Sequence, residues 1–184
     1  GDVRDPGGFA ALGCVERFIL DHDPVRIGPV SITNAIAANV DAIGLAKAGN
    51  VKTAVKAKSM VSEEMHLNEA LEQNNIIPIE TDLGEYILQI DDDVPSHIIA
   101  PVLHRTREYI TKLFHEKLGT SMDATPSQLT KVARQILREG FLNADMGISG
   151  VNFAVAETGT IALVENEGNI RFTTSLPRIH VAVM

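Results

Sequence analysis

The chain has 184 residues, of which 45% are hydrophobic, and it carries a formal net charge of −8. Its length is enough for one buried core, and its acidity argues against nonspecific binding to nucleic acid or anionic membranes, because both rely on a basic surface. The single cysteine, Cys14, excludes an internal disulfide and any four-thiolate metal or iron–sulfur site built from this chain alone.

No apolar run approaches the ~18–20 residues of a membrane-spanning helix, and the N-terminus has no basic segment followed by an apolar one. We therefore expect a cytoplasmic protein that is neither secreted nor membrane-spanning. The chain starts on Gly1 and stops at Met184 within an apolar run, which indicates a fragment, or the ordered part, of a longer protein.

Helical and strand patterns alternate in the first half of the chain. Residues 31–48 carry apolar side chains at helical spacing, and residues 53–57 form a short strand candidate. A helix with Ser62 as its N-cap is predicted over residues 62–74, and a strand follows at residues 76–79. The alternation of residues 85–90 predicts a further strand.

Two helices and three strands are predicted in the second half. The helices cover residues 105–118 and 125–140, and the second begins with Thr-Pro-Ser-Gln, a strong start signal. The strands cover residues 151–156, 160–164 and 179–184, and the first two form a hairpin. This order predicts one α/β domain over residues 1–184, a three-layer α/β/α fold with a mixed, mostly parallel sheet.

The common phosphate-loop, dinucleotide, zinc-protease and serine-hydrolase motifs are absent, so the candidate site rests on polar residues at strand ends. Lys58 and Ser59 follow the strand at residues 53–57 and precede a helix. A lysine and hydroxyls beside exposed helix amides favour the binding of an anion. The alternative is a helix-capping loop with a solvated lysine.

Three carboxylates, Glu80, Asp82 and Glu85, fall within six positions between two predicted strands. They favour a bound cation or an acid/base pair, because neighbouring carboxylates push their pKa values apart. The alternative is a turn whose acids point to water. His97 and His104 flank a proline-interrupted stretch and need not share a face, so we assign no metal site to them.

A third polar stretch lies around the predicted hairpin. Asn152 is followed by Glu157, Thr158, Gly159 and Thr160, in which a carboxylate and two hydroxyls flank a glycine that allows close backbone approach. This composition favours a site for a small polar ligand, and the alternative is a tight hairpin with ordinary turn residues.

Five blocks together resemble the LUD domain of the lactate utilisation protein B family, in order and in spacing: residues 56–64, 67–71, 80–86, 95–98 and 150–160. Residues 1–50 match the family poorly, and Gly168-Asn169-Ile170-Arg171 stands where the family has Gly-Asn-Gly-Arg. The resemblance implies an α/β/α fold similar to the NagB/RpiA/CoA-transferase group. It also implies a role in oxidising L-lactate to pyruvate within a three-protein iron–sulfur complex.

The resemblance further implies a ferredoxin-like region with two four-cysteine cluster motifs, which this chain does not contain. We therefore expect no cofactor within this chain, 4Fe–4S clusters in the family's C-terminal region, and the other lactate-utilisation subunits and a small organic acid as partners.

Two classes of function follow. In the first, which we favour, the domain serves a lactate-oxidising iron–sulfur oxidoreductase by holding a hydroxy or keto acid or by docking a partner subunit. Lys58, Ser59 and Arg171 would bind the carboxylate, and Glu157 or His97 would handle the proton. The remaining candidate ligand-binding residues are Glu63, Asp82, Glu85, Asn152, Thr158, Gly159 and Thr160.

In the second class, the domain is a stand-alone enzyme similar to a CoA-transferase or a sugar-phosphate isomerase, with Glu157 as nucleophile or base. Both hypotheses expect the turn at Lys58 and the loop at Glu157 to converge at one cleft in the sheet.

Overall fold

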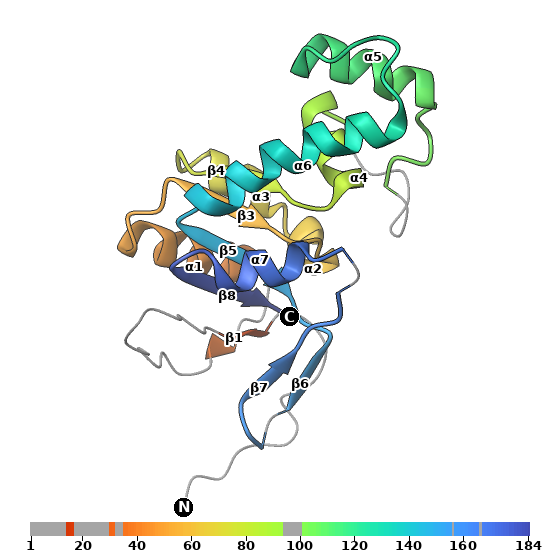
Figure 1. Ribbon diagram of the computed structural model, residues 1–184. Coiled ribbons are helices and arrows are strands. Elements are labelled where there is room, and N and C mark those ends of the chain that lie inside the picture. The colour runs from red at the N-terminus through yellow and green to blue at the C-terminus, as the bar shows by residue number, and fades with distance from the viewer. Residues whose placement is uncertain (1–13, 17–29, 32–34, 94–100, 156, 166) are drawn as a thin grey trace, which may run out of the picture.

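The computed structural model describes residues 14–16, 30–31, 35–93, 101–155, 157–165 and 167–184 (Figure 1). The strands in these residues are β1 (Cys14–Glu16), β2 (Val30–Ser31), β3 (Thr53–Lys56), β4 (Ile77–Glu80), β5 (Met146–Gly150), β6 (Phe153–Val155), β7 (Thr160–Ala162) and β8 (Ile179–Val183). The helices are α1 (Ala35–Ala48), α2 (Met60–Glu64), α3 (Leu67–Glu72), α4 (Leu83–Asp91), α5 (Arg107–Leu118), α6 (Pro126–Asn143) and α7 (Asn169–Ser175).

The main sheet has the strand order β2-β1-β8-β5-β3-β4. Its four strands from β8 to β4 are parallel, whereas β1 is antiparallel to both β8 and β2. Parallel strands need crossover connections, and helices provide them here. All four parallel strands therefore end at one edge of the sheet, where their following loops meet.

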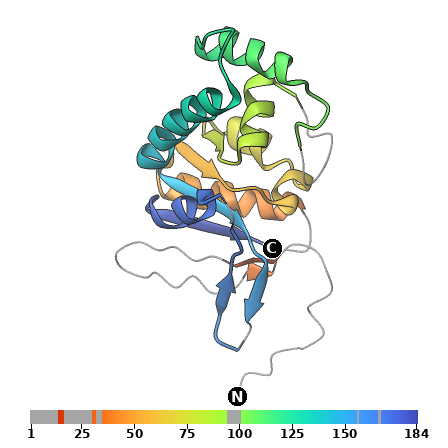
Figure 2. The same cartoon turned by 45° about the vertical axis from the view of Figure 1, so that its right-hand side comes forward.

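Helices cover both faces of this sheet. Successive strand residues point to opposite faces, and in β3 the fully buried Ala54 packs into a cluster with α1 and α3, whereas Val55 packs into one with α4, α5 and α6. Helix α7 lies against β5 (Figures 1 and 2). The predicted three-layer α/β/α fold with a mixed, mostly parallel sheet is confirmed.

The predicted strand at residues 85–90 is wrong, because these residues belong to helix α4. The Asp82 side chain caps this helix by accepting hydrogen bonds from the backbone N–H groups of Gly84 and Glu85, both at 3.1 Å. The apolar residues Leu83, Tyr86, Ile87 and Ile90 then share one helical face that packs into the second core cluster.

The predicted helix at residues 62–74 is two helices. The N-cap of the first helix is Ser59 rather than Ser62. The helix is interrupted at His66, which adopts a left-handed backbone conformation with φ of 52°. Helix α6 starts with the predicted capping box at Thr125 and Gln128.

Strands β6 and β7 form the predicted hairpin, which extends away from the main sheet (Figures 1 and 2). Its apolar side chains are unusually exposed, with Phe153 at 65%. Among the described residues, no helix has both the length and the apolar character that a bilayer crossing requires.

Candidate ligand pocket at the carboxyl ends of the strands

A pocket of about 630 Å³ lies at the edge where the parallel strands β3, β5 and β8 end. This is the edge at which open α/β sheets bind their ligands. The polar side chains in its lining are Lys58, Ser59, Asp82, Ser149, Asn152, Glu167 and Asn169. The apolar part of the lining comes from the β3–α2 loop and the start of α2, the β5–β6 connection, the end of β8, and the segment that runs from β7 into α7.

The loop between β3 and α2 is held in place by its serines. Ser59 caps α2 by accepting from the backbone N–H of Ser62 at 3.3 Å, and the Ser62 hydroxyl donates to the Ser59 carbonyl at 2.8 Å. Gly150 fits closely against this loop, since a Cβ there would come within 3.1 Å of the Ser59 Oγ. The ends of β3 and β5 are therefore in contact at the pocket.

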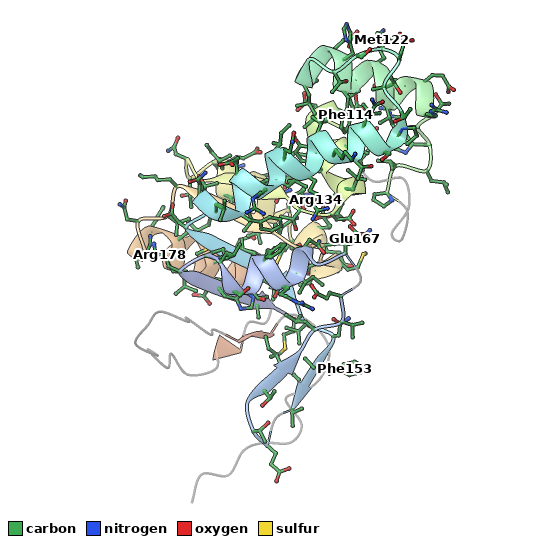
Figure 3. The ribbon with its side chains drawn as sticks, in the orientation of Figure 1. Phe114, Met122, Arg134, Phe153, Glu167 and Arg178 are labelled. Atoms are coloured by element: carbon green, nitrogen blue, oxygen red, sulfur yellow. The ribbon has the colours of Figure 1, made fainter. Side chains whose placement is uncertain are left out.

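Three charged side chains line the pocket. Lys58 is 28% exposed, and Asp82 and Glu167 form a hydrogen-bonded carboxyl pair opposite in charge to it. Burial, followed by the neighbouring Asp82 carboxylate, raises the pKa of Glu167. Figure 3 shows Glu167 on the loop that leads into α7. The pocket thus offers a cation and a carboxyl pair that can share a proton.

A buried ionic cluster lies next to the pocket. Lys56, on β3, is completely buried, and its ammonium contacts Glu63 and, at 2.8 Å, the Oε1 of Glu80. Asn68 donates to the same Glu80 oxygen at 2.7 Å. Despite its burial the pKa of Lys56 is raised, because the two carboxylates outweigh the desolvation that lowers it.

Glu85 joins this cluster to the pocket. Its Oε1 lies 3.7 Å from the Nζ of Lys58, and its side chain is 5% exposed. Burial and then the repulsion of Glu80 and Glu63 raise the pKa of Glu85 to about 8. Carboxylate oxygens of Glu63, Glu80 and Glu85 lie within 4.8 Å of one another, but the Lys56 ammonium already contacts two of the three carboxylates, those of Glu63 and Glu80, so we assign no metal here.

A serine and a histidine form a second buried polar pair beneath the pocket. The Ser149 Oγ lies 2.8 Å from the His180 Nε2, and both side chains are buried. Burial lowers the pKa of His180 to about 4, so the imidazole is neutral at neutral pH. The pair positions the hydroxyl of Ser149, which lines the pocket.

His180 should make the folded protein sensitive to acid. Its pKa is about 4 when folded, against an ordinary value of about 6.5, so the unfolded chain binds the extra proton and stability falls as pH drops from about 6.5 towards 4. We expect His180 to account for about 2 kcal/mol of lost free energy of unfolding between pH 7 and pH 5. Urea unfolding at both pH values should show a smaller loss in His180→Gln, and an equal loss would contradict this assignment.

The structure brings some of the predicted site residues together. Lys58, Ser59, Asp82 and Asn152 line the pocket, and Glu85 pairs with Lys58. Glu63 belongs to the ionic cluster beside the pocket, where it forms an ion pair with Lys56.

Other predicted site residues lie elsewhere. Arg171 is exposed and pairs with Glu165 at 2.7 Å. Glu157, Thr158, Gly159 and Thr160 are exposed in the loop and start of β7 of the projecting hairpin and do not line the pocket, so the expected convergence of Lys58 and Glu157 is not found. His97 lies outside the described residues.

The sequence analysis missed several polar residues of this region. Glu167 and Asn169 come from the loop before α7 and its first turn, and Ser149 and His180 come from two buried strands. The glycine at position 168 was a sequence signal for the loop that carries Glu167 and Asn169. In the structure Gly168 has a φ of 82°, a backbone conformation that favours glycine.

The geometry defines an α/β domain with a polar ligand pocket at the carboxyl ends of its parallel strands. Within that class the chain belongs to the LUD domain family, whose model matches residues 34–184. The resemblance inferred from the sequence blocks is confirmed. No solved structure matches the chain.

Curated relatives carry closely similar sequences. "Lactate utilization protein B" of Bacillus pumilus is 55% identical over 141 residues, which are 76% of this chain and 30% of that protein. The same-named protein of Shouchella clausii is 57% identical over 131 residues, 71% of this chain and 28% of that protein. "Uncharacterized electron transport protein YkgF" of Escherichia coli is 51% identical over 140 residues, 76% of this chain and 30% of that protein. The chain thus spans under a third of these relatives' length.

Proposed function

We propose that this domain binds a small hydroxy or keto acid, lactate or pyruvate, for an iron–sulfur protein that oxidises L-lactate to pyruvate. Relatives of the matching segment are named for lactate utilization and electron transport. The observation that carries the proposal is that Lys58 and the Asp82–Glu167 carboxyl pair line the same pocket.

A hydroxy acid has two recognisable ends, and the pocket has a group suited to each. Its carboxylate needs a cation, which Lys58 supplies through a charge-assisted hydrogen bond. Its hydroxyl needs an acceptor, which the Asp82–Glu167 pair supplies, and this pair can also take up the hydroxyl proton during oxidation. In this proposal the pair takes the proton-handling role, because Glu157 is exposed on the hairpin.

The oxidation also removes the hydrogen on the hydroxyl carbon, which amounts to a second proton and two electrons, and we assign the acceptor of all three to a part of the full-length protein that this chain does not span. A 4Fe–4S cluster needs about four thiolates, and the one cysteine of the chain, Cys14, does not fit that requirement. We therefore derive no step through a cluster. Partner subunits of a lactate-utilisation complex belong to the same proposal, and the exposed apolar hairpin around Phe153 (Figure 3) is a surface suited to them.

Replacing Lys58 tests the proposal. Lys58→Gln removes the pocket's cation but keeps a polar side chain, so we expect calorimetric affinity for lactate and pyruvate to fall about ten- to a hundred-fold at pH 7. The control is Lys52→Gln, an exposed lysine that does not line the pocket. Equal binding by both variants and the wild type would contradict the proposal.

A further inference from the structure

The buried cluster holds more acid than its lysine can neutralise. Glu63, Glu80 and Glu85 bring their carboxylate oxygens within 4.8 Å of one another, yet the Lys56 ammonium forms ion pairs with only Glu63 and Glu80. Glu85 is therefore left with the repulsion of two carboxylates in a nearly dry environment. Such a group stays ionised only if another cation comes to it.

That cation is the lysine of the ligand pocket. Lys58 Nζ lies 3.7 Å from Glu85 Oε1, which is the sole ion pair that the structure shows for Lys58 among the described residues. When Glu85 is ionised, it holds Lys58 as a counter-ion and competes with any anion in the pocket. When Glu85 is protonated, the Lys58 charge is available to the pocket.

We propose that Glu85 controls the anion affinity of the pocket, so that a carboxylate ligand binds to Lys58 together with a proton held on Glu85. This inference rests on the proposed function for its ligand, a small carboxylic acid, and adds a positioning residue that acts through Lys58. The ligand's carboxylate replaces Glu85 as the ionised partner of Lys58, and Glu85 keeps or gains the proton that neutralises it.

The direction of the pH dependence follows from the groups that face Glu85. Glu80 from β4 and Glu63 from α2 favour its protonated form, whereas Lys56 from β3 and Lys58 from the β3–α2 loop favour the ionised form. Burial, the largest cause, together with the repulsion of the two carboxylates raises the pKa of Glu85 to about 8. Ligand affinity should therefore be highest below about pH 8 and decline above it, because the form with a protonated Glu85, which binds the ligand, becomes the minor form.

Calorimetry with pyruvate, lactate and acetate at pH 7 and pH 9 tests this coupling. In the wild type we expect affinity to fall about tenfold between these pH values, with nearly one proton taken up per ligand at pH 9, measured from the buffer dependence of the heat. Glu85→Gln is permanently neutral and should bind at pH 9 within about twofold of its affinity at pH 7, with no such proton uptake. Glu64→Gln, which removes an exposed carboxyl of α2 that does not line the pocket, should keep the wild-type fall.

The possible results separate the two proposals. If acetate binds as well as lactate and pyruvate and shows the same pH dependence, the Glu85 coupling stands and the hydroxy-acid assignment fails. If lactate binds with equal affinity at both pH values, or if Glu85→Gln keeps the fall, the coupling is overturned while the proposed function stands. If no carboxylate binds at either pH, both are overturned.

Discussion

Lys56→Met should lose about 3–5 kcal/mol of the free energy of unfolding, the penalty for breaking a buried ion pair from one side. The methionine fills similar space, but Glu63 and Glu80 lose the ammonium that they contact. The buried Glu80 carboxylate must then take up a proton or draw in water, whereas Glu63, 34% exposed, already has access to solvent. Urea unfolding at pH 7 measures the loss as a lower transition midpoint at an unchanged slope.

An exposed lysine gives the matched control. Lys112, 63% exposed, pairs with Glu116 at 3.6 Å on the surface of α5, so Lys112→Met should change stability by less than about 1 kcal/mol. If Lys56→Met expresses poorly, the double variant Lys56→Met/Glu80→Gln should recover part of the stability because one uncompensated charge is removed. Equal stability of the two single lysine variants would show that the Lys56 cluster does not stabilise the fold.

Gly147→Ala should lower the free energy of unfolding by about 3 kcal/mol, which is at the upper end of the penalties for overpacking a core. A Cβ at Gly147 would come 1.8 Å from the backbone carbonyl oxygen of Thr173 in α7, and a backbone atom cannot rotate away. Helix α7 would have to move off β5. Because its first residues, Asn169 and Ile170, line the pocket, binding of the pocket's ligand should weaken as well.

Gly44→Ala is the control for that substitution. Gly44 lies within α1 and is exposed, and an added Cβ would meet no atom within 4 Å. Alanine in the interior of a helix should therefore raise stability by about 0.5–1 kcal/mol. Unfolding curves are measured for both alanine variants. If the two curves shift in the same direction relative to the wild type, the tight contact between β5 and α7 is contradicted.

Local patterns predicted most elements correctly. The α6 start is an example, since Thr125 and Gln128 satisfy each other's backbone within four residues. The error at α4 arose because residues 85–90 alternate when considered alone. Starting from Leu83 instead, the apolar positions recur at helical spacing, and Asp82 followed by Glu85 is a helix-start pattern.

The site was harder to predict because its partners are distant in sequence. Lys58 and Asp82 were visible as polar residues at strand ends, whereas Glu167 reaches Asp82 only through the placement of α7. Lysine side chains are almost always exposed, so the sequence around Lys56 did not predict that this side chain is completely buried. The prediction for Glu157 did not take account of the length of the β6–β7 hairpin, which carries the loop between these two strands away from the main sheet.

The most direct test of the pocket is a titration of the ¹⁵N-labelled protein with pyruvate at pH 7, followed by backbone amide shifts in NMR spectra. The account predicts the largest shifts at Ser59, Gly150 and Asn169, which line the pocket, and none at Thr158 and Gly159 on the hairpin. Shifts concentrated on the hairpin, with the three pocket amides unchanged, would contradict it.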